Sequence, residues 1–205
     1  ILAHPLENGK IVNWVETRQR DGSADEFLRS RTFYDGLGGK IMTRAGGETY
    51  GQVVVTDTVQ FNARKQPWKK YLPYFETGTT DFAEPTFSSG YTEHFYDALG
   101  REIRMNQPAG SEGIVYSETS YEALSRTIRD EEQTNPASKH FGCGMRYVED
   151  GLQDKDGKGR LRQVYEIVKL DDKGEALSSP VEWRTSYDYD LLDNLTHITD
   201  SQNNE

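Results

Sequence analysis

The chain has 205 residues, of which 34% are hydrophobic when tyrosine is counted, and its formal net charge at pH 7 is −10. This length suits one domain or two small ones, and the low apolar share argues against a thick, deeply buried core. The acidic charge argues against a nucleic-acid partner, because binding to phosphates needs a basic stripe. One short basic run, which we interpret as a solvated strand face, comprises Arg64, Lys65, Lys69 and Lys70.

Cys143 is the only cysteine in the chain, so no internal disulfide can form. No run approaches the roughly 18–20 apolar residues of a membrane helix, which predicts that the chain has no membrane span. No signal peptide opens the chain, and both ends look cut from a longer sequence. We therefore expect a fragment that is held together by side-chain burial and backbone pairing.

The first thirty residues predict a hairpin followed by a linker. Asn8-Gly9 separates residues 4–6 from the apolar stretch 11–15, which is the pattern of a two-residue hairpin turn. Residues 23–26 have the spacing of a capping box, so one short helix is expected there. We assign residues 1–30 to this N-terminal hairpin and linker segment.

The rest of the chain predicts strands separated by turns and loops. The stretches expected to be strands from their β-branched and aromatic residues are 53–55, 58–61, 143–152 and 160–170. Residues 74–92 are rich in Thr, Ser, Gly and Pro, which predicts a long loop over the surface. Residues 117–128 include good helix formers, but a repeated pattern in the chain favours strands there.

That pattern is a template of an aromatic residue, Asp, any residue, usually Leu, Gly, two further residues and an apolar one. The stretches that follow it begin at Tyr34, Phe61, Tyr96, Tyr121, Leu170 and Tyr189. The first and third stretches match fully, whereas the fourth has Glu122 in place of Asp and Ser125 in place of Gly. The fifth stretch lacks the ring, and Asp193 replaces Gly in the sixth.

Each stretch has the chemistry of a β-hairpin. The aromatic residue ends one strand, and the following Asp or Asn can bond backbone N–H groups two residues on. Gly at the fifth place takes the positive φ that reverses the chain, which Lys65 and Ser125 tolerate less well, so distorted turns are expected there. The residues to which we assign a structural role in the repeat are Tyr34, Asp35, Gly38, Phe61, Tyr96, Asp97, Gly100, Tyr121, Gly174, Tyr189 and Asp190.

These stretches resemble the tyrosine–aspartate (YD) repeats of rearrangement-hotspot (RHS) proteins, of bacterial insecticidal toxin complexes and of teneurins. The resemblance covers most of the chain from Arg31 to Asn204, and residues 34–38, 59–64 and 71–75 look most like the B component of toxin complexes. It implies that residues 31–205 form a YD-repeat β-sheet region. The predicted fold is all-β: antiparallel hairpin repeats that form a curved sheet, with at most one or two short helices.

The resemblance also implies a function, that of a structural, non-catalytic wall segment in a shell that encapsulates or helps deliver a toxic C-terminal polypeptide. The implied partners are neighbouring repeats of the same parent chain and the toxin or toxin-complex components, and no cofactor is implied. Such a protein would be secreted by a bacterium or displayed on its surface, and would act in virulence. The alternative is an extracellular β-module that binds carbohydrate or protein.

Two pairs of residues suggest metal or nucleophile chemistry. Asp154 and Asp156 alternate as in a calcium loop, but the acid needed at the twelfth place is displaced by one, and a hairpin turn explains them without metal. His140 and Cys143 lack the two further soft ligands that zinc needs. They also lack the orienting group of a Cys–His nucleophile, so we predict neither a metal site nor a catalytic residue.

Two further groups suggest binding to or cleavage of carbohydrate. The rings that would form a sugar-stacking platform are Trp14, Trp68, Tyr71, Tyr74, Phe75 and Trp183. Rings on strands are more often packed against the inner face of the sheet. Asp130 and Glu132 would share one face of a strand while Glu131 faces away, and we interpret all three as a solvated turn.

Overall fold

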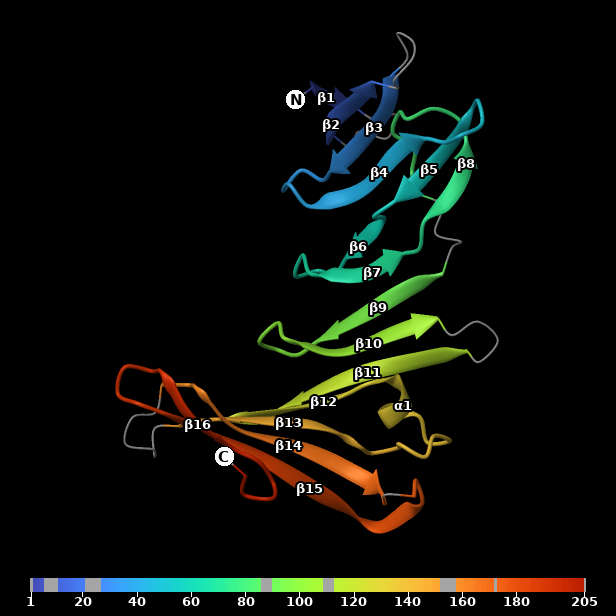
Figure 1. Ribbon diagram of the computed structural model, residues 1–205. Helices are drawn as coiled ribbons and strands as arrows, with labels where there is room; N and C mark the ends of the chain where they lie inside the picture. Colours follow the sequence, from blue (N-terminus) through green and yellow to red (C-terminus); the bar gives the residue numbers. More distant parts are fainter. Residues whose placement is uncertain are drawn as a thin grey trace. The chain divides into compact units, whose positions relative to one another are not determined.

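The computed structural model describes residues 2–5, 11–20, 27–85, 90–108, 113–151, 158–171 and 173–204. These residues form antiparallel strands and one four-residue helix, α1 (Glu131–Thr134) (Figure 1). The all-β fold predicted from the repeats is therefore confirmed. The contacts divide the chain into two compact units, residues 1–94 and residues 95–205.

The first unit contains a six-stranded antiparallel sheet. Its strands, in the order in which they pair, are β1 (Leu2–Pro5), β2 (Ile11–Arg20), β3 (Phe27–Tyr34), β4 (Lys40–Gly46), β5 (Gln52–Thr56) and β8 (Tyr74–Thr77). The other strands of this unit are β6 (Val59–Phe61), β7 (Pro67–Tyr71) and the start of β9 (Tyr91–Tyr96). β7 pairs with both β6 and β9.

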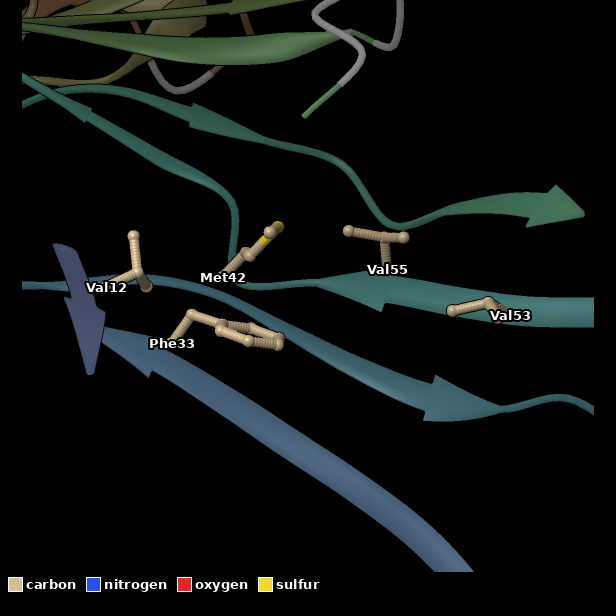
Figure 2. Packing of buried hydrophobic residues seen from close by; sticks show 5 residues of the cluster. All are labelled: Val12, Phe33, Met42, Val53 and Val55. Atoms are coloured by element: carbon tan, nitrogen blue, oxygen red, sulfur yellow. The ribbon is translucent and has the colours of Figure 1, made fainter. Parts of the chain in front are cut away.

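The core of the first unit lies on one face of this sheet. Alternate residues of a strand share a face, and the register places Trp14, Phe33 and Met42 opposite one another in neighbouring strands. The buried cluster shown in Figure 2 comprises Val12, Phe33, Met42, Val53 and Val55. These residues are β-branched, aromatic or long and apolar, so a pleated face buries them well.

Residues 78–85 cover part of this core. Phe82 packs edge-on against Phe33, with ring centroids 5.3 Å apart. Asp81 forms an ion pair with Arg31, and the carbonyl of Thr79 accepts a hydrogen bond from buried Arg44. The prediction of a loop across residues 74–92 is wrong at both ends, because β8 and β9 include those ends. Between them, the chain supplies an apolar residue to the core.

The second unit is a meander in which each strand pairs with the next. After the end of β9 come β10 (Glu102–Pro108), β11 (Ile114–Tyr121), β12 (Ser125–Arg129), β13 (Gly144–Glu149), β14 (Leu161–Leu170), β15 (Ala176–Tyr189) and β16 (Leu195–Thr199). The prediction that residues 117–128 are strands against their helix propensity is confirmed. Cross-strand pairing decided the conformation there over local preference.

The helix α1 begins at the acids that the sequence placed in a solvated turn. The turn is wrong, because these residues start a helix, but Asp130 and Glu132 are exposed as predicted. Asp130 is its N-cap: the carboxylate accepts from the N–H of Gln133 at 2.9 Å, and the Gln133 side chain accepts from the N–H of Asp130 at 3.0 Å. This is a capping box, which satisfies two N–H groups at the start of a helix. The hydroxyl of Thr134 donates to the carbonyl of Tyr116 and anchors the helix to β11.

Three predictions lie outside the described residues: the Asn8-Gly9 turn, the short helix at residues 23–26 and the loop containing Asp154 and Asp156. Among the described residues, no helix is both long and apolar enough to cross a membrane.

Candidate functional site

The repeat template forms a hairpin turn with four recurring hydrogen bonds, which the turn at Asp97 illustrates. The N–H of Asp97 donates to the carbonyl of Arg101 at 2.9 Å, and the N–H of Gly100 donates to the carbonyl of Asp97 at 3.1 Å. One carboxylate oxygen of Asp97 accepts from the N–H groups of Leu99 and Arg101 at 2.8 and 2.9 Å. Gly100 has φ +85°, so the left-handed conformation predicted for the fifth place is present.

The same four bonds recur in four of the five other turns of the template. The residues that accept the side-chain bonds in them are Asp35, Asn62, Asp171 and Asp190. The fifth place has positive φ in each, at Gly38 (84°), Lys65 (63°), Gly174 (78°) and Asp193 (66°). The turn at Lys65 is therefore regular, contrary to the distortion that the sequence led us to expect.

The turn after Tyr121 differs from the others. The N–H of Glu122 donates to the carbonyl of Ser125 at 2.8 Å, so the turn closes one residue earlier. The Glu122 carboxylate accepts from the hydroxyl of Ser125 at 3.0 Å in place of backbone N–H groups. Glutamate is one methylene longer than aspartate, so its carboxylate reaches past the N–H groups that an aspartate would bond.

A further turn of the same kind, which the template did not predict, begins at Asp200. Its carboxylate accepts from the N–H groups of Gln202 and Asn204, both at 2.8 Å, and Asn203 has φ +63°. The N–H of Asp200 donates to the carbonyl of Asn204 at 3.1 Å. No aromatic residue precedes this turn, so the template did not match it. The available signal was Asn at the left-handed place, because Asn tolerates positive φ.

An enlarged version of the turn, also missed, begins at Asp150. Its carboxylate accepts from the N–H groups of Lys158 and Arg160 at 3.1 and 2.6 Å, and its N–H donates to the carbonyl of Arg160 at 2.8 Å. Gly159 has φ +76° and directly precedes the closing residue, as in the short turns. Asp154 and Asp156 fall between Asp150 and Lys158 in the sequence and lie outside the described residues.

The aromatic residues of the template are half-buried, and arginines stack on several rings. Tyr34, Phe61, Tyr96, Tyr121 and Tyr189 all have this intermediate exposure. The Arg101 guanidinium lies 4.1 Å from the ring centre of Tyr121, and that of Arg160 lies 5.2 Å from Tyr189. The closing residue of one turn thus covers the aromatic residue of a later one. Such cation–π contacts contribute about 0.5–1 kcal/mol each at exposed sites.

The turn carboxylates have lowered pKa values. In Asp35 and Asp97, desolvation raises the pKa, but the backbone N–H bonds and nearby cations outweigh it. In Asp190 and Asp200, the side-chain amides of Asn194 and Asn204 lower the pKa first, followed by the same residues' N–H groups. Hydrogen bonds to the ionised form favour that form, so these aspartates stabilise the fold when they are charged.

The lowered pKa values of these aspartates predict that the fold loses stability in acid. An aspartate whose pKa is lower in the folded state than its unfolded value of about 3.9 stabilises the fold when it is charged. This stability is fully present above the unfolded pKa and is lost as the pH falls through the folded pKa. We expect the free energy of unfolding to be nearly flat from neutral pH to about pH 5 and to fall steeply below about pH 4. The double variant Asp97→Asn/Asp190→Asn should keep the turns, because Asn62 forms the same turn naturally. Its free energy of unfolding, measured by urea titration at each pH, should fall less steeply below about pH 4 than that of the wild type. An equally steep fall in the variant would show that these two carboxylates do not stabilise the fold.

A glycine pair in the first turn isolates the effect of backbone conformation. Gly36 and Gly38 both have open space where a Cβ would lie, but only Gly38 has positive φ. Gly38→Ala should therefore lower the free energy of unfolding by about 1 kcal/mol, whereas Gly36→Ala should leave it nearly unchanged. Gly100→Val should be destabilising for the same reason. Equal melting temperatures for the two alanine variants would show that the turn does not hold its left-handed geometry.

The other candidate groups do not assemble into a site. Cys143 is buried while His140 is exposed and lies 3.8 Å from Glu132. Within the described part of the chain, no three His, Cys, Asp or Glu side chains are grouped as metal ligands would be. The basic run is split between the β6–β7 turn and β7, where Lys69 lies 4.4 Å from the ring centre of Trp68.

The rings considered for sugar binding are distributed over both units. Tyr71 is buried, Phe75 is 67% exposed, and Trp14 is covered by the guanidinium of Arg31 at 4.7 Å. Trp183 belongs to the second unit, on β15. Of these rings, Trp68, Phe75 and Trp183 are exposed, and they are divided between the two units.

The fold is similar to that of three solved structures. The crystal structures of TcdB2-TccC3 and of TcdB2-TccC3 without its hypervariable C-terminal region each match 93% of this chain with a TM-score of 0.70 and 19% sequence identity. The structure of the Photorhabdus luminescens Tc holotoxin pore with a TccC3 mutation matches 94% of it, with a TM-score of 0.72 and 19% identity. This chain spans 10% of the length of each of those chains.

No curated protein matches the chain. A family model does: a domain of unknown function, DUF6443, matches residues 11–142. This is more than half of the chain, and it includes the turns at Asp35, Asn62 and Asp97. The chain therefore belongs to the DUF6443 family.

Proposed function

We propose that this chain is a structural, non-catalytic wall segment of a larger β-sheet shell of the RHS and toxin-complex type. The observation that carries the proposal is the recurrence of one turn geometry, which joins β3 to β4, β6 to β7, β9 to β10, β14 to β15 and β15 to β16. The similarity in fold to a tenth of a TcdB2-TccC3 chain supports it. In this role the chain works through its sheet and needs no cofactor.

The edge at β16 supports continuation of the wall. β16 pairs with β15 and with no other strand that the structure describes. The turn at Asp200 has the geometry that starts a return strand elsewhere in the chain. A strand entering after Asn204 would lie on the open edge of β16, where its backbone groups would find partners.

Exposed apolar side chains on one face of the second unit support the proposal that another part of the assembly covers this face. The register places Ile103, Ile128, Trp183 and Ile198 on this face, and these side chains remain 37–47% exposed. Exposed apolar groups that share a face mark a surface that is covered in the assembled state. We propose that neighbouring repeats of the parent chain or an enclosed toxic polypeptide cover it. The parent would be exported by a bacterium and act in virulence.

The test is hydrogen exchange of β16 in the 205-residue chain, measured together with light scattering over a range of concentrations. A wall segment with an open edge should exchange its β16 amides quickly as a monomer and protect them only when it self-associates. A monomer with a fully protected β16 would show a closed domain and count against the proposal. Binding on a glycan array would then favour the free-standing binding module.

A further inference from the structure

A hollow with a volume of about 560 Å³ lies on the face of the second unit opposite to the apolar one. It is bounded by β11, β12, β14 and β15, and by α1 with the segment that follows it. Its size is within the range of small-molecule sites, roughly 300–1,000 Å³. It plays no part in the proposed wall function, which rests on the turns, the strand edge and the other face.

Two glycines make room for two cationic side chains in this hollow. A Cβ at Gly144 would lie 3.1 Å from Cγ of Arg129, so the arginine side chain lies over the glycine backbone. A Cβ at Gly142 would lie only 2.5 Å from Nζ of Lys169, and Gly142 also has φ +81°. Larger residues at these two positions would displace both cations.

The charges in the hollow leave one cation without a carboxylate. Arg129 donates to Glu118 at 2.8 Å, and Glu182, the other acid in the lining, accepts from Arg146 at 2.7 Å. Among the described residues, Lys169 has no ion pair, and its ammonium lies 5.6 Å from the ring centre of Phe141.

A neutral donor also lines the hollow. The capping box uses Oε1 of Gln133 to accept from the N–H of Asp130. The Nε2 amide of Gln133 therefore has its two N–H bonds without a partner in the described part of the chain. Gln133 lines the hollow together with Lys169.

Apart from Thr134, the rest of the lining is apolar or aromatic. Tyr116, Phe141, Ile167 and Pro180 contribute to the walls. A ligand therefore meets a positive charge and an amide donor next to surfaces that exclude water. An inorganic anion would contact only the positive charge and the amide donor. An anion with an apolar body would contact the apolar surfaces as well.

We propose that this hollow binds an organic carboxylate with a ring-sized apolar body. The carboxylate takes the ammonium of Lys169 and the Gln133 amide, and the ring lies against Phe141 and Ile167. Two sources share this chemistry: a free small acid, and the C-terminal residue of a polypeptide. Burial of the ring supplies affinity, and Lys169 supplies selectivity for the acid over its neutral amide.

The experiment is an NMR titration of the 205-residue chain with N-acetyl-phenylalanine and, separately, with its amide. We expect a dissociation constant of about 1 mM for the acid, shifts centred on the amides of Phe141, Gly142 and Lys169, and binding of the amide weaker by about fivefold or more. A peptide of three glycines ending in phenylalanine separates the sources. Tighter binding than N-acetyl-phenylalanine assigns the hollow to a polypeptide terminus, and weaker binding assigns it to a small acid.

The decisive variant is Lys169→Gln, with Lys173→Gln as the matched control on an exposed turn outside the hollow. Lys169→Gln should bind acid and amide equally, at an unchanged melting temperature, while Lys173→Gln keeps the preference for the acid. The proposal is overturned if the wild type binds acid and amide equally or shows no shifts in the hollow up to about 20 mM. It is also overturned if Lys173→Gln removes the preference as completely as Lys169→Gln.

Discussion

Replacing Glu76 with leucine should lower the free energy of unfolding by about 3–5 kcal/mol, because the charge of Arg44 then stays buried without its carboxylate. The Arg44 side chain is only 3% exposed, and its Nη1 lies 2.8 Å from Oε2 of Glu76. Its other terminal nitrogen donates to the carbonyl of Thr79, and Nε is buried without a hydrogen-bond partner. The Thr79 carbonyl is neutral and cannot balance the charge.

Urea unfolding of three variants measures this effect. The double variant Arg44→Met/Glu76→Leu removes both charges and should lie within about 1 kcal/mol of the wild type, since an apolar pair of similar size can replace a buried ion pair. Glu182→Leu breaks the more exposed pair with Arg146 and should cost less than about 1 kcal/mol. If Glu76→Leu costs no more than Glu182→Leu, Arg44 is solvated and the buried pair described here does not exist.

A second cation, Arg31, lies next to Arg44 in the sheet of the first unit and adds to the positive charge that acidic residues must balance there. Arg31 is directly opposite Arg44 across β3 and β4, which brings two like charges together. Desolvation lowers the pKa of Arg31, but hydrogen bonds to Glu16 and Asp81 outweigh it and raise that pKa. The pKa of Glu16 is lowered, first by its hydrogen bond with Arg31. Buried Arg44 thus pairs with Glu76, and half-buried Arg31 pairs with Glu16 and Asp81.

The hairpin turns could be predicted from the sequence because their causes are local. An Asp or Asn, a residue that tolerates positive φ and a closing residue lie within five positions of one another, and their hydrogen bonds involve only those positions. Lys65 shows the limit of this reasoning. Its side chain disfavours the left-handed conformation, yet the four bonds made with Asn62 and Gln66 hold it there.

Features that depend on distant residues could not be predicted. The acid that accompanies Arg44 is 32 positions away, and the hollow with Lys169 combines residues from four strands and a helix. The aspartate at Asp150 closes its turn only after an insertion, so the spacing that identifies the short turns is lost. The capping box at Asp130 was readable from its Gln at the third helical position, but the strand pattern on both sides concealed it.

The second large effect should come from Phe33, whose replacement by alanine should cost about 3–5 kcal/mol in the free energy of unfolding. Phe33 is 1% exposed and lies in the cluster of Figure 2, so its truncation leaves a cavity in the core. Phe33→Leu should cost less, because it keeps most of the buried apolar volume.

The partner variant tests whether residues 78–85 belong to the core. Phe82 contacts Phe33 edge-on, so Phe82→Ala alone should cost about 2–4 kcal/mol and should speed hydrogen exchange in β3 and β4. The two losses should not add: once Phe33 is absent, Phe82 has lost its ring partner, and the double variant should cost less than the sum by about 0.5–1.5 kcal/mol. Strict additivity, with unchanged exchange in β3, would show that Phe82 lies away from the core. Residues 78–85 would then be the surface loop that their composition predicts.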